Sequence, residues 1–195
     1  MALQKIWKLK GFGGSDQLEL SQAEIPNASE DQVIIKNEAI GLNYLDIYFR
    51  TALYPWPNQE EIKILGSEAA GTVTEIGVGV KHLKVGDRVV YVVPVGAYAE
   101  YVSVHSKHVA KIPDPVSFDT AAASLLKGIT AYYLLHDTFS LKSGQTALVH
   151  AAAGGVGQLL GQWGSEIGAI MIGTAGGKEK CKTAIVANYD HVIDY

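Results

Sequence analysis

Residues 150–158 read HAAAGGVGQ and form a glycine-rich turn between two segments of different pattern. The apolar run before the turn predicts a buried strand, and the longer stretch after it predicts a helix. The same alternation continues towards the end of the chain. The expected strands are 144–152, 169–175 and the start of a third at 191–195, and the expected helices are 156–168 and 178–188. Alternating strands and helices predict βαβ units with a parallel sheet.

The first 115 residues follow a different pattern of short strands separated by glycine turns. Residues 31–42 and 69–77 are rich in β-branched residues, and Gly77, Gly79 and Gly86 lie where positive φ or close backbone approach is expected. Such spacing predicts a compact β barrel or sandwich. The chain is therefore expected to be of the α/β class, with a β-barrel or β-sandwich domain over 1–124 and the first part of a doubly wound parallel sheet over 125–195.

A helical segment joins the two expected domains. Residues 120–137 are rich in helix formers, and Ser117 and Asp119 stand where helix caps are expected. Gly128 lies in the middle of this segment, and glycine is unfavourable inside a helix. The pattern therefore predicts two helices with a break near Gly128.

The composition narrows the classes of function. The net charge is −4 and no block of like charge occurs, which argues against nucleic acid or an anionic membrane as partner. Neither a signal peptide nor a membrane-spanning stretch is visible. The single cysteine, Cys181, cannot form an internal disulfide and is typical of a reducing compartment. We therefore expect a cytoplasmic protein.

The glycine-rich turn suits a dinucleotide. Residues 152–157 (AAGGVG) match G-x-G-x-x-G, with Ala152 at the first glycine position. At such a turn the free N–H groups and the dipole of the following helix attract a pyrophosphate, and a side chain would block its approach. The alternative is a Gly/Ala turn that serves only helix–strand packing.

The tip of the second strand bears on which dinucleotide is bound. An NAD site usually offers a carboxylate about 20 residues after the glycine turn, for the ribose 2′-hydroxyl. This chain offers Thr174 and glycines there, then Lys178 and Lys180, with Glu179 displaced into the helix. Ammonium groups without a carboxylate suit a 2′-phosphate, so NADPH is the expected cofactor. The alternative is that both lysines are solvated residues paired with Glu179.

Several motifs in order resemble one family. They are NYLDIYFRTALYP (43–55), LGSEAAGTV (65–73), GVGVKHLKVGDRVV (77–90), AAASLLKGITAYYLL (121–135) and the glycine-rich turn. The chain is similar to the NADPH:quinone oxidoreductases (zeta-crystallin-like) of the medium-chain dehydrogenase/reductase superfamily. The resemblance implies a GroES-like domain and a Rossmann domain with the cofactor between them. Family members are longer and homodimeric, so we expect a truncated chain, whose oligomeric state is left open.

The resemblance also bears on metal binding. Zinc alcohol dehydrogenases of the superfamily carry a cysteine and a histidine where this chain has Asn43 and Ser67. Amide and hydroxyl groups are poor zinc ligands compared with thiolate and imidazole. We therefore expect no metal. Glu68 is interpreted either as a remnant of a metal-binding ancestor, in which it supported the ligands, or as a residue with a structural role.

The expected site residues follow from these motifs. Asn43, Tyr48 and Tyr54 are the expected catalytic residues, because amide and phenol groups can donate to a carbonyl and tyrosine rings can stack on a quinone. The expected cofactor-binding residues are Tyr44, Asp46, Tyr48, Thr130, Tyr133, Gly154, Gly155, Val156, Gly157, Gly176, Gly177, Lys178, Lys180 and Tyr195. For each tyrosine the alternative is an ordinary core or helix-packing role.

These features predict an NADPH-dependent reductase that transfers hydride to small-molecule quinones without zinc. A quinone is already electron-poor, so it needs alignment and a hydrogen-bond donor rather than a Lewis acid. Two alternatives stay open at this stage. One is a reductase of α,β-unsaturated carbonyls on the same fold, and the other is a non-catalytic truncated relative that binds nucleotide.

Overall fold

The computed structural model describes residues 2–57 and 61–195. The chain separates into two compact units, Met1–Leu125 and Leu126–Tyr195. They are called the first and the second unit, and each is described by itself. The division falls inside one helix, α2 (Phe118–Tyr133).

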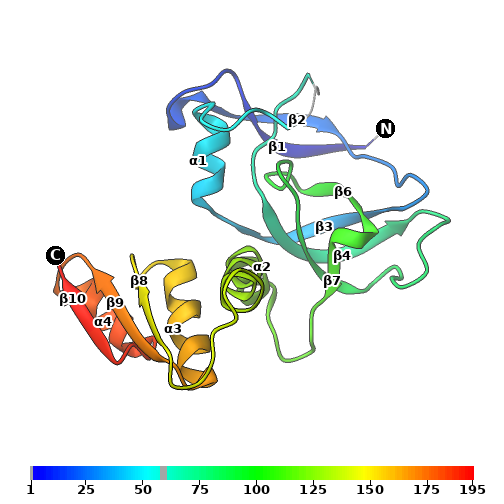
Figure 1. Cartoon of the computed structure of the whole chain (residues 1–195). Helices are drawn as coiled ribbons and strands as arrows, with labels where there is room; N and C mark the ends of the chain where they lie inside the picture. Colours follow the sequence, from blue (N-terminus) through cyan, green and yellow to red (C-terminus); the bar gives the residue numbers. More distant parts are fainter. Residues whose placement is uncertain (1, 58–60) are drawn as a thin grey trace. The chain divides into compact units, whose positions relative to one another are not determined.

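The first unit is built on antiparallel strands (Figure 1). Its elements are β1 (Leu3–Leu9), β2 (Leu18–Glu24), β3 (Gln32–Gly41), α1 (Tyr44–Arg50), β4 (Glu68–Ile76), β5 (Arg88–Val92), β6 (Tyr101–His105) and β7 (Val109–Lys111), with short 3₁₀ turns at Ser15–Gln17 and Ser106–His108. The order β6-β3-β4-β5-β7 makes a five-stranded sheet, and β1-β2 is a separate hairpin. Bridges Ile6↔Ala99 and Lys8↔Ile64 tie that hairpin to the segments beside the sheet.

Close backbone approach explains the glycines of this unit. A Cβ on Gly77 would lie 1.9 Å from the carbonyl oxygen of Ser29, and one on Gly79 would lie 2.4 Å from Oδ1 of Asp31. Gly86 adopts a φ of +89°, which side chains rarely allow. The expectations for these three glycines are confirmed.

The core of the first unit consists mainly of aliphatic side chains from one face of the sheet. Its members with almost no exposure include Ile6, Val33, Ile35, Ala69, Val73, Val89, Tyr91 and Val104. Alternating strand residues supply them, as expected for a sheet with one buried face. This packing holds the strand ends from which the candidate site is built.

The expected helix break at Gly128 is wrong. Helix α2 runs without interruption from Phe118 to Tyr133 and continues as a π-helical turn, η3 (Leu134–Thr138). A glycine inside a helix costs only about 1 kcal/mol relative to alanine, and the surrounding alanines and leucines favour helix. The expected cap is confirmed, since the Ser117 hydroxyl accepts a hydrogen bond from the Thr120 N–H at 3.1 Å.

The second unit has the expected βαβ pattern. Its further elements are β8 (Thr146–Val149), α3 (Gly155–Ile167), β9 (Ile170–Ala175), α4 (Lys178–Val186) and β10 (His191–Asp194). All pairings are parallel, in the order β10-β9-β8 (Figure 1). The carboxyl ends of the three strands therefore lie at one edge of the sheet, where ligands bind in α/β folds.

No helix in the described ranges has both the length and the apolar character that crossing a bilayer requires.

Candidate functional site

The start of helix α1 is organised by Asn43 and Asp46. Asn43 is the N-cap residue, and its backbone N–H donates to Oδ2 of Asp46 at 2.8 Å. This is a capping box, in which a side chain one turn into the helix reaches back to the cap. Asp46 therefore fixes the point where the chain leaves β3 and enters α1.

Asp46 is buried and accepts hydrogen bonds from more than the cap. Asp46 is only 5% exposed. The Tyr98 hydroxyl donates to Oδ2 at 2.9 Å, and Ser67 Oγ lies 3.2 Å from Oδ1. Glu68, the next residue on β4, is fully buried and accepts from the Asn43 amide at 2.9 Å. Asn43, Asp46, Ser67, Glu68 and Tyr98 are called the Asp46 cluster.

The Ser67 hydroxyl has one proton and two acceptors within reach. Its Oγ lies 3.2 Å from Oδ1 of Asp46 and 3.0 Å from the carbonyl oxygen of Pro94. A hydroxyl donates only once, so it serves either Asp46 or Pro94. When it donates to Pro94, the contact with Asp46 is satisfied by a proton on Oδ1. The cluster therefore has hydrogen-bonding arrangements for both the ionised and the protonated Asp46.

The environment of Asp46 raises the pKa of its carboxyl group. Desolvation by burial raises the pKa of the Asp46 carboxyl above 3.8, and the neighbouring Glu68 charge adds to that rise. Hydrogen bonds from Asn43, Tyr98 and Ser67 oppose it. Burial, and then the Asp46 carboxylate, also raise the pKa of the Tyr98 hydroxyl, so Tyr98 is a donor at neutral pH.

The two residues at the superfamily's zinc-ligand positions come together in this cluster. Asn43 uses its amide to bind Glu68, and Ser67 uses its hydroxyl within the Asp46–Pro94 pair. Within residues 2–57 and 61–195, no group of three or more His, Cys, Asp or Glu side chains could hold a metal. The donors at these positions are amide and hydroxyl groups, which are poor ligands for zinc.

The tyrosines of the expected catalytic set lie in an aromatic group beside this cluster. The rings of Tyr48 and Tyr54 are 5.3 Å apart between centroids, and Phe49 meets Tyr54 edge-on at 5.9 Å. The backbone N–H of Tyr54 donates to the carbonyl oxygen of Tyr48, which closes the turn after α1. Tyr44 projects from the first turn of α1 and is 76% exposed. The structure thus joins Tyr48 to Tyr54, and Asn43 to Asp46.

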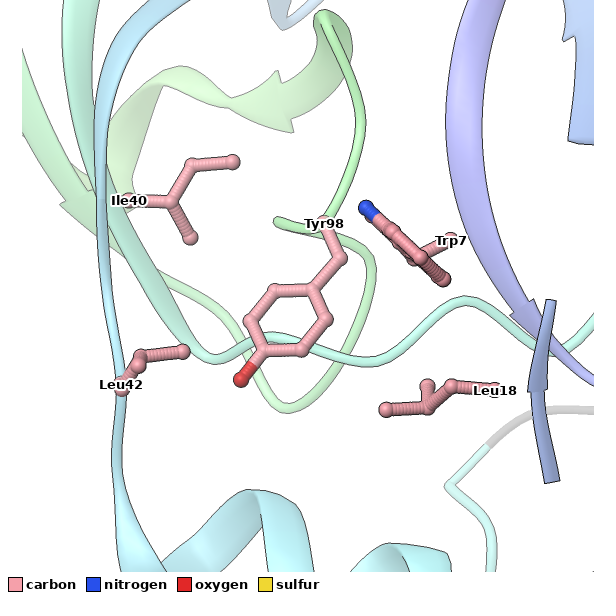
Figure 2. A pocket seen from close by; sticks show the side chains of 5 residues that line it. All are labelled: Trp7, Leu18, Ile40, Leu42 and Tyr98. Carbon is pink, nitrogen blue, oxygen red and sulfur yellow. The ribbon is translucent and has the colours of Figure 1, made fainter. Parts of the chain in front are cut away.

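Tyr98 was not among the residues expected from the sequence. Its ring covers Gly66, where a Cβ would lie 2.3 Å from the ring, and Gly66 has a φ of +96°. The same ring lines an apolar hollow of about 270 Å³. Figure 2 shows it among the other side chains that line this hollow. The other lining residues are Trp7, Leu18, Ile40 and Leu42. Only the folded chain brings Tyr98 to Asp46, so no local pattern could have found it.

In the second unit, the glycine-rich turn leads into α3 as expected. Gly154 is the N-cap of α3 and its N–H bonds to the carbonyl oxygen of Ala151, which has a φ of +54°. The N–H groups at the first helical positions have no acceptor within a helix, so Gly155 and Val156 present donors at this edge. This arrangement fits a pyrophosphate, because a helix N-terminus attracts negative charge.

The glycines of the turn have different roles. A Cβ on Gly157 would lie 2.4 Å from the carbonyl oxygen of Ala151, and Gly157 is buried with its own carbonyl bonded to Tyr189 at 2.7 Å. Gly154 has more room, with its nearest neighbour at 3.1 Å. Gly157 is therefore needed for packing of α3 against the turn, whereas Gly154 leaves space at the surface.

Helix α2 contributes a lysine that was not expected from the sequence. A Cβ on Gly155 would lie 2.8 Å from Cδ of Lys127, so the lysine stem covers the glycine-rich turn. Thr130, one turn further on, donates its hydroxyl to the carbonyl oxygen of Leu126 at 2.8 Å. Tyr133 is 44% exposed. The helical spacing of Lys127 and Thr130 could have signalled a shared face.

The tip of the second strand carries no carboxylate of its own, as its sequence indicates, but the third strand brings one to the loop that follows it. Oδ1 of Asp194, at the end of β10, accepts a hydrogen bond from the Gly177 N–H at 2.6 Å. Gly177 is the N-cap of α4 and has a φ of +88°. Tyr195 lies beside Gly176, within 3.6 Å of where its Cβ would stand. Adjacent parallel strands bring the end of β10 to this loop, residues 176–180.

Lys178 and Lys180 lie exposed at the start of α4. Their exposure is what the alternative of solvated surface lysines also expects, but the pairing with Glu179 is absent, because Glu179 pairs with Lys182 at 2.8 Å. Within the described ranges, neither Lys178 nor Lys180 forms an ion pair. Both ammonium groups are thus available to an anion at the 176–180 loop.

Comparison with known proteins agrees with this fold. The family model of the alcohol dehydrogenase GroES-like domain matches residues 29–114. Quinone oxidoreductase 1 of Escherichia coli is 43% identical over 184 residues, which cover 94% of this chain and 56% of the relative. A 2-haloacrylate reductase of Burkholderia is 37% identical over 187 residues, covering 94% of this chain and 56% of that relative.

A solved structure matches both units. The Escherichia coli quinone oxidoreductase complexed with NADPH has a TM-score of 0.92 and 41% identity, covering 98% of this chain and 58% of that one. The chain thus spans just over half the length of the relatives it matches. It carries a GroES-like domain and the start of a Rossmann sheet, and it is a homologue of the quinone oxidoreductases in the medium-chain dehydrogenase/reductase superfamily.

Proposed function

We propose that this chain belongs to an NADPH-dependent reductase that passes hydride to quinones without zinc. The observation that carries the proposal is the Asp46 cluster. At the two positions where zinc enzymes of the superfamily place ligands, Asn43 and Ser67 are hydrogen-bonded to buried carboxylates at 2.9 and 3.2 Å. The names of the relatives and the NADPH complex of one of them support the same function.

The second unit is proposed to bind the phosphates. The N-terminus of α3 would receive the pyrophosphate at Gly154, Gly155 and Val156. The loop of Gly176, Gly177, Lys178 and Lys180, with Tyr195 beside it, would receive the 2′-phosphate of the adenosine ribose. NADPH, when bound, supplies the hydride. The protein supplies orientation and charge at these two places.

The first unit is proposed to hold the acceptor. Tyr48 and Tyr54 offer rings for stacking on a planar quinone, and a phenol can donate to the carbonyl oxygen as negative charge develops there. Asp46 acts by holding the start of α1, which carries Tyr44 and Tyr48. The Asn43 amide already donates to Glu68, so its proposed role toward an acceptor requires that bond to be shared or exchanged.

The experiment is NADPH oxidation followed at 340 nm with 1,4-benzoquinone as acceptor, with and without a chelator. It uses the 195-residue chain and, should the gene encode more, the longer product. The proposal expects turnover that a chelator leaves unchanged and that Tyr48→Phe lowers. Absence of turnover with every quinone tested, or complete loss of activity on chelation, would overturn it.

A second candidate function is reduction of an activated carbon–carbon double bond. It is favoured by the 37% identity to a 2-haloacrylate reductase over almost the whole chain. The same assay with 2-chloroacrylate and an enone in place of the quinone distinguishes the two. A kcat/KM for the haloacrylate above that for benzoquinone would favour the second candidate. The cytoplasm is the proposed compartment, on the evidence of the single cysteine.

A further inference from the structure

The carboxylate of Asp194, from the end of β10, lies at the 176–180 loop. Oδ1 of Asp194 accepts from the Gly177 N–H at 2.6 Å, and Asp194 pairs with Ala175 in the β9–β10 ladder. Asp194 belongs to β10 and its acceptor oxygen meets the N-cap residue of α4, so the strand places the carboxylate at this loop.

This carboxylate occupies the direction from which a phosphate oxygen would approach Gly177. A backbone N–H has one proton, and here it is already directed at Asp194. A 2′-phosphate dianion at the loop would therefore share or displace that bond and would meet a like charge. A ribose 2′-hydroxyl has no such charge, and it can donate to a carboxylate. The residue thus acts differently on the two cofactors.

We propose that Asp194 is a specificity-determining residue of the nucleotide site, which weakens binding of the 2′-phosphate and narrows the preference for NADPH over NADH. The inference rests on the proposed function, because it concerns the cofactor named there. At this loop the charges of Lys178 and Lys180 attract the 2′-phosphate, whereas the charge of Asp194 repels it. Glu179 contributes less to that balance, since its charge is paired with Lys182.

The substitution Asp194→Asn separates charge from geometry. An asparagine keeps a carbonyl oxygen that can accept from Gly177, and it removes the negative charge. We measure binding of adenosine 2′,5′-bisphosphate and of 5′-AMP to the 195-residue chain by calorimetry. We expect the variant to bind the bisphosphate about 3- to 10-fold more tightly, with 5′-AMP changed less than about 2-fold. The gain should shrink in about 1 M salt, where charges are screened within about 3 Å.

Asp190→Asn is the matched control. Asp190 lies just before β10 and accepts from the Met171 N–H at 2.7 Å, so it is a similar carboxylate on a backbone donor. It stands about 13 Å from Asp194 along the strand, beyond the screening length of about 8–10 Å. This variant should leave both affinities unchanged, while thermal unfolding shows that each variant is folded.

The outcomes separate the inference from the proposed function. If the unmodified chain prefers the bisphosphate and Asp194→Asn leaves that preference unchanged, the inference is overturned and the proposed cofactor stands. An equal gain in both ligands, or in the Asp190→Asn variant, also overturns it. If the unmodified chain shows no preference for the bisphosphate, the assignment of NADPH fails and the inference fails with it.

Discussion

The Asp46 cluster of the first unit and the 176–180 loop of the second unit both place a carboxylate on the N–H of a helix N-cap residue. Asp46 is 5% exposed and is contacted by side-chain donors from the residue before β4 and from the segment before β6. Asp194 lies at the surface, and its carboxylate accepts a hydrogen bond from the backbone N–H of Gly177. The same local contact is thus buried in one unit and open to solvent in the other.

This difference in exposure determines whether the charge of each carboxylate affects folding stability or ligand binding. In the buried cluster a change of charge is a change of stability, because the carboxylate has lost water and depends on its donors. In the exposed loop a change of charge costs the fold little, and it acts on any anion that approaches. Substitutions in the cluster should therefore be seen first in unfolding, and substitutions in the loop should be seen first in binding.

The largest expected effect is that of Asp46→Ala. The change leaves the Asn43 N–H and the hydroxyls of Ser67 and Tyr98 without their acceptor, at a cost of about 4 kcal/mol in the free energy of unfolding. Asp46→Asn should cost much less, because its amide keeps an oxygen that can accept from Tyr98 and a nitrogen that can donate to Ser67. Urea unfolding of both variants measures the difference. Equal losses of unfolding free energy would contradict the description of Ser67 as a hydroxyl that can donate either to Asp46 or to Pro94.

The pH dependence of the same pair sharpens the comparison. The pKa of Asp46 is raised above 3.8 in the folded chain. Between pH 3.8 and that raised pKa, the folded state therefore binds more protons than the unfolded state. The stability that Asp46 contributes is therefore fully present below 3.8 and is lost as pH rises through the raised pKa. Asp46→Asn should remove this fall, and a wild-type curve that instead rises over the window would contradict the sign.

The next effect is expected at the glycine-rich turn. Gly157→Ala would place a Cβ 2.4 Å from the carbonyl oxygen of Ala151, and backbone rather than a flexible side chain must move. We expect a loss of about 2 kcal/mol in unfolding free energy, together with weaker nucleotide binding. Gly154→Ala, with a nearest contact of 3.1 Å, is the control and should change stability by less than about 1 kcal/mol.

Tyr98→Phe tests the cluster with a smaller change. It removes the hydroxyl that donates to Oδ2 of Asp46 and keeps the ring that covers Gly66. We expect a loss of about 1.5 kcal/mol at neutral pH. The pKa of Asp46 should also rise further, because the Tyr98 hydrogen bond lowers it. A pH series of unfolding in both proteins measures the shift, and no shift would show that Tyr98 supports α1 by packing alone.

The smallest expected effect is at the loop. Lys180→Ala should reduce the preference for NADPH over NADH by about 3- to 10-fold, because it removes a positive charge from the proposed 2′-phosphate site. The thermal transition should stay the same. Lys142→Ala is the control within the same unit, since Lys142 is exposed and lies before β8, outside the 176–180 loop. An unchanged cofactor ratio in the Lys180 variant would remove the lysine argument.

The parts that could be predicted are those determined over short distances in the chain. The strand–turn–helix around 150–158, the parallel order of the second unit and the close-packed glycines of the first follow from local pattern. The break at Gly128 was predicted wrongly, because a single unfavourable residue cannot end a helix whose neighbours favour it. Each of these predictions used the residues of one segment only. That was enough for the strands and turns, but it gave too much weight to Gly128 alone.

Contacts between distant segments decided the rest. Tyr98 reaches Asp46 across 52 positions of the chain, and nothing in either segment announces the pair. Asp194 reaches Gly177 across 17 positions because parallel strands end at the same edge of the sheet. That rule could have placed Asp194 at the loop from sequence, in addition to the residues at the tip of the second strand itself.

The sequence by itself determined the two kinds of architecture, the glycine-rich turn and the amide and hydroxyl at positions where related enzymes carry zinc ligands. Periodicity, turn chemistry and residue type are local properties, so one chain is enough to read them. Only the tertiary structure decided the charge environment of the two carboxylates. Burial and hydrogen-bond partners depend on which distant segments meet, and these set whether Asp46 acts on stability and whether Asp194 acts on binding.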